Sequence, residues 1–154
     1  MPVTDVMTTR LVSVAPADTA AEAIKRMVAA NVGSVVVVDR SRLVGIFTER
    51  DVLRLAAEGT SFADARIGDV MTPSPKTVGP DDDILEASHV MAAQRVRHVP
   101  VAVGGQVLGV VGIRDVVRVL LERAYRGHDG DAHATARNLL RGKSGPVSSP
   151  AEGA

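Results

Sequence analysis

The feature that most limits the possible folds of this chain is an internal repeat. Val6-Met7-Thr8 recurs 64 residues later as Val70-Met71-Thr72, and the same offset still relates Asp51 to Asp115. Chance does not keep one register over so long a stretch, so residues 5–60 and 69–124 are copies of one unit. Other matching pairs are Asp5 and Asp69, Val14 and Val78, Pro16 and Pro80, Asp18 and Asp82, Glu22 and Glu86, Met27 and Met91, Gly45 and Gly109, and Arg50 and Arg114.

Each copy has about 60 residues, a size at which an isolated hydrophobic core is only marginally stable. We therefore expect the two copies to pack together, with a binding cleft at their junction. The chain is divided into a first repeat at 1–62, a second at 63–124 and a tail at 125–154. Because Gly, Ser, Pro and Ala dominate the tail, we expect a short helix at 132–141 and disorder after it.

In the first copy the residue pattern predicts the order strand, helix, strand, strand, helix. The strands are expected at 11–14, 34–38 and 43–47, and the helices at 20–30 and 48–57. Thr-x-x-Glu at 19–22 is a capping box, which marks the start of the first helix.

The second copy repeats this order. Asp83 and Glu86 cap its first helix, Gly104-Gly105 forms a tight turn between strands at 99–103 and 107–111, and a last helix covers 115–123. Helices would cover a small sheet in each copy, so the predicted fold class is α/β or α+β.

Composition excludes several function classes. Lys plus Arg equals Asp plus Glu, at 18 each, so no long-range attraction to nucleic acid or to an anionic membrane is expected. The chain has no Cys, which excludes disulfides and thiolate metal sites. The N-terminal residues lack the pattern of a signal peptide, and the apolar runs are too short to span a bilayer. A cytoplasmic protein is the expectation.

The segment that is most informative about chemistry runs from Gly45 to Asp51, where a strand leads into a helix. Gly45 permits another backbone to approach closely. Thr48 and Asp51 occupy the first positions of the helix, where free N–H groups favour anions. A carboxylate there can also accept two hydrogen bonds from a vicinal diol such as that of ribose.

Helix capping is the alternative interpretation of the same residues, because Thr-x-x-Asp is also a plain capping arrangement. Two features favour more than capping. Asp returns at 115 although its capping partner there is Gly112, and an Arg precedes each Asp, at 50 and 114.

These residues make the repeat resemble the cystathionine β-synthase (CBS) domain family. The marks are Asp-Val-Met-Thr at the start of each copy, Arg-His-Val-Pro-Val at 97–101 and Gly-Ile-Phe-Thr-Glu-Arg-Asp at 45–51. The resemblance implies two CBS domains related by pseudo-two-fold symmetry. It also implies a non-catalytic regulatory module that binds AMP, ADP, ATP or S-adenosylmethionine between the repeats, with no required cofactor. A homodimer and an unknown effector protein are the expected partners.

By resemblance, the motif Asp residues contact the ribose hydroxyls, and the segment before the first strand borders adenine and ribose. Basic residues entering the second strand contact phosphate. The predicted ligand-binding residues are Thr8, Thr48, Arg50, Asp51, Thr72, Arg97, His98, Arg114 and Asp115. The resemblance further implies that Asp115 faces Thr8 and that Asp51 faces Thr72.

The two copies depart from the family pattern in different ways. Gly112 removes a hydroxyl near Asp115, and Gly33-Ser34 stands in the first copy where Arg97-His98 stands in the second. The two sites should therefore differ, and occupation of only one of them is an open alternative.

Other functions are weaker predictions. A module that dimerises or binds proteins without a ligand is the main alternative, and an enzyme is a distant third because no nucleophile lies beside a base. The segment from Gly127 to His133 superficially resembles a metal site, but we expect a loop there and no metal. No catalytic residues are predicted.

Overall fold

The computed structural model describes residues 1–126. The chain divides into one compact unit at Met1–Val116 and another that begins at Val117. The strands of both repeats lie in the first unit, and the last helix, α5 (Ile113–Arg126), begins there and continues into the second. The helix expected at 132–141, the disorder expected after it and the loop expected at 127–133 lie outside the described residues.

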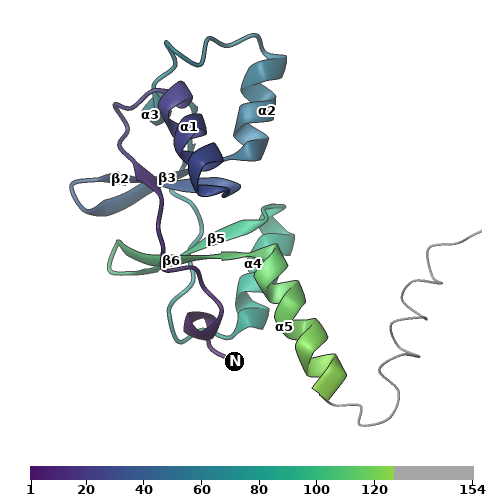
Figure 1. Cartoon of the computed structure of the whole chain (residues 1–154). Helices are drawn as coiled ribbons and strands as arrows, with labels where there is room; N and C mark the ends of the chain where they lie inside the picture. Colours follow the sequence, from purple (N-terminus) through teal and green to yellow (C-terminus); the bar gives the residue numbers. More distant parts are fainter. Residues whose placement is uncertain (127–154) are drawn as a thin grey trace, which may run out of the picture. The chain divides into compact units, whose positions relative to one another are not determined.

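The first repeat contains two helices that lie on the same side of a β-hairpin (Figure 1). Its elements are β1 (Ser13–Val14), α1 (Ala20–Ala30), β2 (Ser34–Asp39), β3 (Arg42–Thr48) and α2 (Glu49–Ala57). Strand β1 runs parallel to β2, and β2 pairs antiparallel with β3. The order predicted from sequence is confirmed, although β1 is shorter than the predicted strand.

The second repeat is built in the same way. Its elements are α3 (Ile67–Val70), β4 (Thr72–Pro73), α4 (Ile84–Gln94), β5 (His98–Val103) and β6 (Gln106–Gly112), followed by α5. Strands β5 and β6 are antiparallel, and Gly104 and Gly105 form their turn with φ values of 58° and 84°. The predicted glycine turn is thus confirmed. The equivalent turn of the first repeat places Arg40 and Ser41 at φ 48° and 65°, a conformation that glycine adopts at lower cost. The α/β class with flanking helices is also confirmed.

Local capping explains where the first long helix begins and ends. The Thr19 hydroxyl accepts a hydrogen bond from the N–H of Glu22, and the Glu22 carboxylate accepts one from the N–H of Thr19, at 3.2 and 2.9 Å. Asn31 ends α1 in the left-handed region with φ 53°, a conformation that Asn tolerates well. In the second repeat, the Asp83 carboxylate instead caps α4 through the N–H of Leu85.

The segment that opens each repeat packs on the other repeat. The N–H of Val3, in the short 3-10 helix η1 (Val3–Asp5), donates to the carbonyl of Asp82, and the N–H of Ile67 donates to the carbonyl of Asp18, both at 2.8 Å. The pairs Val3 and Ile67, and Asp18 and Asp82, are each related by the same 64-residue offset. Both Val3 and Ile67 are fully buried.

A second reciprocal contact follows immediately along the chain. Thr8 forms a β-bridge with Val110 of β6, and Thr72 in β4 pairs with Ile46 of β3. Because each repeat contributes to the other's core and sheet, the duplicated halves depend on each other for stability. The repeat limits at 1–62 and 63–124 remain a proposed division of the sequence.

Candidate functional site

A cleft of about 730 Å³ lies between the two repeats within the first unit. From the first repeat it is lined by the segment before β1, by α1 and by the starts of β2 and α2. From the second repeat it is lined by the start of β5, by β6 and by the first turn of α5. This volume is in the range of small-molecule sites.

Five of the nine predicted ligand-binding residues line this cleft. They are Thr8, Arg97, His98, Arg114 and Asp115. Thr8 comes from the first repeat and Asp115 from the second, and both line this cleft, while their contact with one ligand stays a prediction. Gly33 and Ser34 line the same cleft, so the starts of β2 and β5 both border it.

The first turn of α5 brings Asp115 to the cleft. Its Oδ2 atom accepts a hydrogen bond from the N–H of Gly112 at 3.2 Å, which is the capping contact that the alternative interpretation requires. The side chain is nevertheless half-buried at the cleft wall. Capping and a contact with ligand are therefore compatible at this position.

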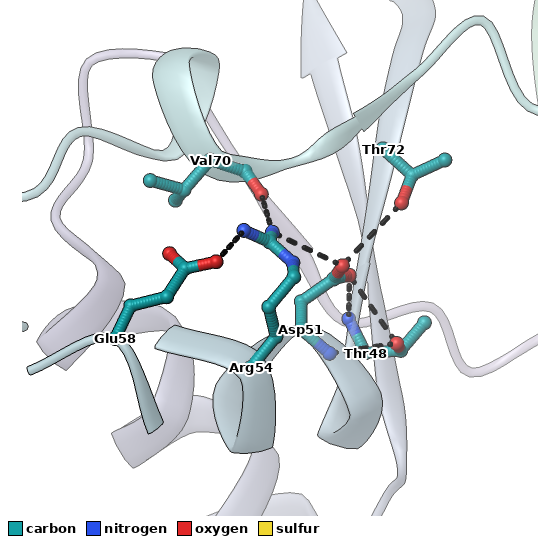
Figure 2. A network of polar contacts seen from close by, with 6 residues as sticks. All are labelled: Thr48, Asp51, Arg54, Glu58, Val70 and Thr72. Carbon is teal, nitrogen blue, oxygen red and sulfur yellow. Dashed lines mark hydrogen bonds and ion pairs between the residues drawn. The ribbon is translucent and has the colours of Figure 1, made fainter. Parts of the chain in front are cut away.

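Three of the other four predicted residues, Thr48, Asp51 and Thr72, form a separate network (Figure 2). Asp51 Oδ2 accepts hydrogen bonds from the N–H and the hydroxyl of Thr48, at 2.9 and 3.2 Å. Its Oδ1 atom accepts from the Thr72 hydroxyl at 3.5 Å. The Thr48 hydroxyl in turn accepts from the N–H of Asp51 at 3.4 Å, which completes a capping box.

Arg54 closes this network on the remaining side (Figure 2). Its Nη2 atom lies 3.6 Å from Asp51 Oδ1 and donates to the carbonyl of Val70 at 3.1 Å. Its Nη1 atom lies 3.6 Å from Glu58 Oε1. Asp51 is buried, and both of its oxygens have partners. A diol at this carboxylate would have to compete with those internal contacts.

Arg50 and Arg114 also differ, although they occupy the same position in the two repeats. Arg50 Nη1 donates to the backbone carbonyl of Arg95 at 2.9 Å, which joins α2 to the end of α4. Within residues 1–126, the Arg114 side chain makes no hydrogen bond or ion pair, and it lines the cleft.

His98 lies between two glycines and two acidic side chains. A Cβ at Gly33 would be 3.1 Å from His98 Cε1 and 3.2 Å from Glu49 Oε1. A Cβ at Gly112 would be 3.5 Å from His98 Cδ2 and 3.3 Å from Asp115 Oδ2. Gly33 therefore makes room for the imidazole ring, and Gly112 makes room chiefly for the Asp115 carboxylate.

The groups around His98 shift its pKa in opposite directions. Burial lowers the pKa of His98 below its ordinary value of 6.5, and Arg114 and Arg97 lower it further, whereas Glu49 and Asp115 raise it. Burial is the largest of these effects, so the ring is mainly neutral at neutral pH. A neutral imidazole can donate one hydrogen bond and accept another.

Sequence reasoning missed two charged residues of the cleft, Arg10 and Glu49, and its apolar wall on α1. The wall includes Ile24 and Met27. Arg10 has Ser74 as its counterpart in the second repeat. That mismatch within the repeat was the available signal.

Neither a metal site nor a membrane-spanning helix is found in the described part of the chain. Residues 1–126 contain no group of three or more His, Cys, Asp or Glu side chains arranged to hold a metal ion. No helix in that range combines the length and apolar character needed to cross a bilayer.

Comparison with protein families matches the CBS domain at residues 3–58 and again at 67–122. The chain belongs to the CBS domain family. The tandem pair recognised from the repeat and its motifs is thereby confirmed.

Among CBS proteins, the chain is 41% identical over 110 residues to the mitochondrial CBS domain-containing protein CBSX3 of Arabidopsis thaliana. That match covers 68% of this chain but only 53% of CBSX3, so the chain spans about half the length of this relative.

Two solved CBS structures are similar and contain ligands. CBSX2 in complex with AMP shares 29% identity with a TM-score of 0.70, covering 80% of this chain and 98% of that one. The CBS pair of MJ0100, in complex with 5′-methylthioadenosine and S-adenosyl-L-methionine, shares 24% identity with a TM-score of 0.72, covering 78% and 99%. The second likeness shows the fold alone.

Proposed function

We propose that this CBS pair is a non-catalytic sensor module that binds an adenosine-containing ligand in the cleft between its repeats. The observation that carries the proposal is that Thr8 and Asp115, from different repeats, line one cleft together with Arg97 and His98. CBSX2, a structural relative, binds AMP, which supports an adenosine ligand here.

The proposal assigns chemical roles to four polar residues of the cleft and to its apolar wall. Asp115 accepts hydrogen bonds from the ribose diol, and Thr8 borders the nucleoside from the opposite repeat. Arg97 and His98 donate to a phosphate or other acidic group. The apolar wall of α1 contacts the adenine ring, which loses apolar surface to water on binding.

Ligand in this cleft would favour one relative placement of the repeats. Couplings of this kind are typically about 1–3 kcal/mol. Since the reciprocal contacts of Val3 and Ile67 tie the repeats together, a change at the cleft reaches both. The output would pass to an effector protein or to a second copy of the chain. A location in the cytoplasm stays a prediction from the sequence.

Thr48, Arg50, Asp51 and Thr72 are proposed as a second, weaker site. Its use requires Asp51 to exchange its contacts with Thr48 and Thr72 for contacts with ligand. Asp115 is only half-buried at the wall of the first cleft, whereas Asp51 is buried, so the first cleft should be filled first.

Isothermal titration calorimetry of the full chain with AMP, ATP and S-adenosylmethionine tests the proposal. At least one compound should bind, and Asp115→Ala should weaken it by about tenfold or more, the value of a well-made charge-assisted hydrogen bond. Asp81→Ala, which makes the same change at an exposed position outside the cleft, is the control. Absence of heat and of a thermal shift with every adenosine compound would reject the proposal.

A ligand-independent homodimer or interaction module is the second candidate, and exposed apolar residues favour it. Leu53 on α2 is 73% exposed, and Val117, at the same position of α5, is 46% exposed. On α5 further exposed apolar side chains follow at helical spacing. They are Ile113, Leu120, Leu121 and Tyr125. Protein purified with empty clefts, and with a stability that nucleotides do not change, would favour this candidate.

A further inference from the structure

The cleft gathers three arginines whose side chains make no hydrogen bond or ion pair within residues 1–126. They are Arg10, Arg97 and Arg114. Other arginines that lie near the repeat junctions are already engaged, as when Arg50 bonds to Arg95 or Arg66 bonds to the carbonyl of Ala17. The donors of the cleft arginines are thus available to something that enters it.

Two acidic residues in the same cleft reduce this positive charge only in part. Glu49 and Asp115 line the cleft, and Asp115 is already engaged with the N–H of Gly112. Three guanidinium groups against two carboxylates leave the cleft with a formal charge of +1 when His98 is neutral. A cleft that excludes part of the solvent strengthens the effect of such an imbalance.

The positive charge is specific to this cleft and is not a property of the duplicated unit. The 64-residue offset relates Arg10 to Ser74 and Arg97 to Gly33. It relates Arg114 to Arg50, whose guanidinium is held by the carbonyl of Arg95. Three available guanidinium groups therefore come together at one site only.

From this arrangement we infer that the cleft selects adenosine ligands that carry phosphate over neutral or cationic ones, with Arg10 and Arg114 as specificity-determining residues. The inference rests on the proposed function and deepens it. Guanidinium donors match phosphate oxygens in geometry as well as charge. S-adenosylmethionine carries a sulfonium and an ammonium against a single carboxylate, so its net positive charge would meet the same arginines unfavourably.

Calorimetry on the full chain separates these ligand classes, because AMP and adenosine differ only in the phosphate. AMP should bind at least about tenfold more tightly than adenosine and than S-adenosylmethionine, as expected for one or more charge-assisted hydrogen bonds. Raising the ionic strength should weaken AMP binding and leave adenosine binding nearly constant, since salt screens only the charged part.

Arg10→Gln and Arg114→Gln should each reduce the ratio of AMP to adenosine affinity by about fivefold or more. Lys25→Gln makes the same change of charge at an exposed position that does not line the cleft, and it should leave the ratio unchanged. Thermal melting of each variant establishes that it is folded, so that a lost ratio reports on the site.

The outcomes distinguish this inference from the proposed function. If adenosine and S-adenosylmethionine bind as tightly as AMP, selection by phosphate is wrong while the sensor module stands. If the arginine variants keep the wild-type ratio, their assigned role is wrong. If no adenosine compound binds, the proposed function fails and this inference fails with it.

Discussion

Gly109 in β6 lies so close to Met7 that a Cβ at this position would be 2.7 Å from the methionine sulfur. The same Cβ would be 2.9 Å from the backbone carbonyl oxygen of Thr8. Gly45 makes the equivalent approach to Met71 and to the carbonyl of Thr72. The prediction that Gly45 permits a close backbone approach is confirmed, and the approaching backbone is the opening segment of the other repeat.

Gly109→Ala should therefore destabilise the protein by about 1–3 kcal/mol, the usual cost of overpacking. The sulfur can move, but the Thr8 carbonyl is held by its bridge to Val110. Urea denaturation followed by circular dichroism measures the change. Gly79→Ala is the control, because its nearest new contact would be an ordinary 3.5 Å. If the two variants were equally stable, the close approach of Gly109 to the opening segment of the first repeat would not matter for stability.

Asp51→Ala should lower the free energy of unfolding by about 1–3 kcal/mol. The substitution removes the acceptor of the Thr48 and Thr72 hydroxyls and one partner of Arg54. Chemical denaturation measures the loss, and Asp81→Ala, at an exposed position, is the control. A variant as stable as the wild type would show that this network contributes little to the fold.

Stability should fall as the pH drops below about 6.5 because of His98. Its pKa in the folded protein is lowered, chiefly by burial, below the value of 6.5 that applies to the unfolded chain. As the pH falls from 6.5 towards the lower folded-state pKa, the unfolded state takes up the proton first and is stabilised. The contribution of His98 to the stability of the fold is therefore complete above pH 6.5 and is lost as the pH falls below that value.

Urea titrations at a series of pH values between 7.5 and 5 measure this effect. His98→Asn should flatten the decline, because it removes the titrating group from both states. His89→Asn, at an exposed position of α4, is the matched control. A decline that is equally steep in His98→Asn and in the wild type would assign the effect to other residues.

The exposed apolar residues of α5 predict association of two copies. Leu121 is 43% exposed and lies one helical turn from Val117. Leu121→Asp should convert a dimer into a monomer, because it places a charge on a face that association would remove from water. Light scattering coupled to size exclusion measures the mass. Arg126→Gln changes the charge by the same amount on the same helix and should leave the mass unchanged.

Ligand-dependent stabilisation gives an independent check on the cleft. AMP at one hundred times its dissociation constant should stabilise the wild type by about 2.7 kcal/mol, since it binds only the folded state. Gly33→Val should reduce this effect, because its Cβ would enter the space shared by His98 and Glu49. Thermal melting with and without AMP measures both. An undiminished shift in Gly33→Val would place the ligand elsewhere.

Sequence alone determined the duplication, the order of the elements, the capping box at Thr19 and the glycine turn at Gly104. These features depend on residues within a few positions of each other, or on a comparison of the chain with itself, so they can be read without a structure. The motifs also identified Thr8, Arg97, His98, Arg114 and Asp115, the five predicted residues that line the cleft.

Only the tertiary structure decided which contacts join the two halves. The opening segment of the first repeat packs on the second repeat, where the N–H of Val3 donates to the carbonyl of Asp82. Arg50 differs from Arg114 because the carbonyl of Arg95 lies within hydrogen-bond distance of its guanidinium. Such contacts join residues that are distant in sequence, and they are set by packing rather than by local pattern. Val3 and Ile67 keep equivalent partners, whereas Arg50 and Arg114 do not, because the residues around these two arginines differ between the repeats.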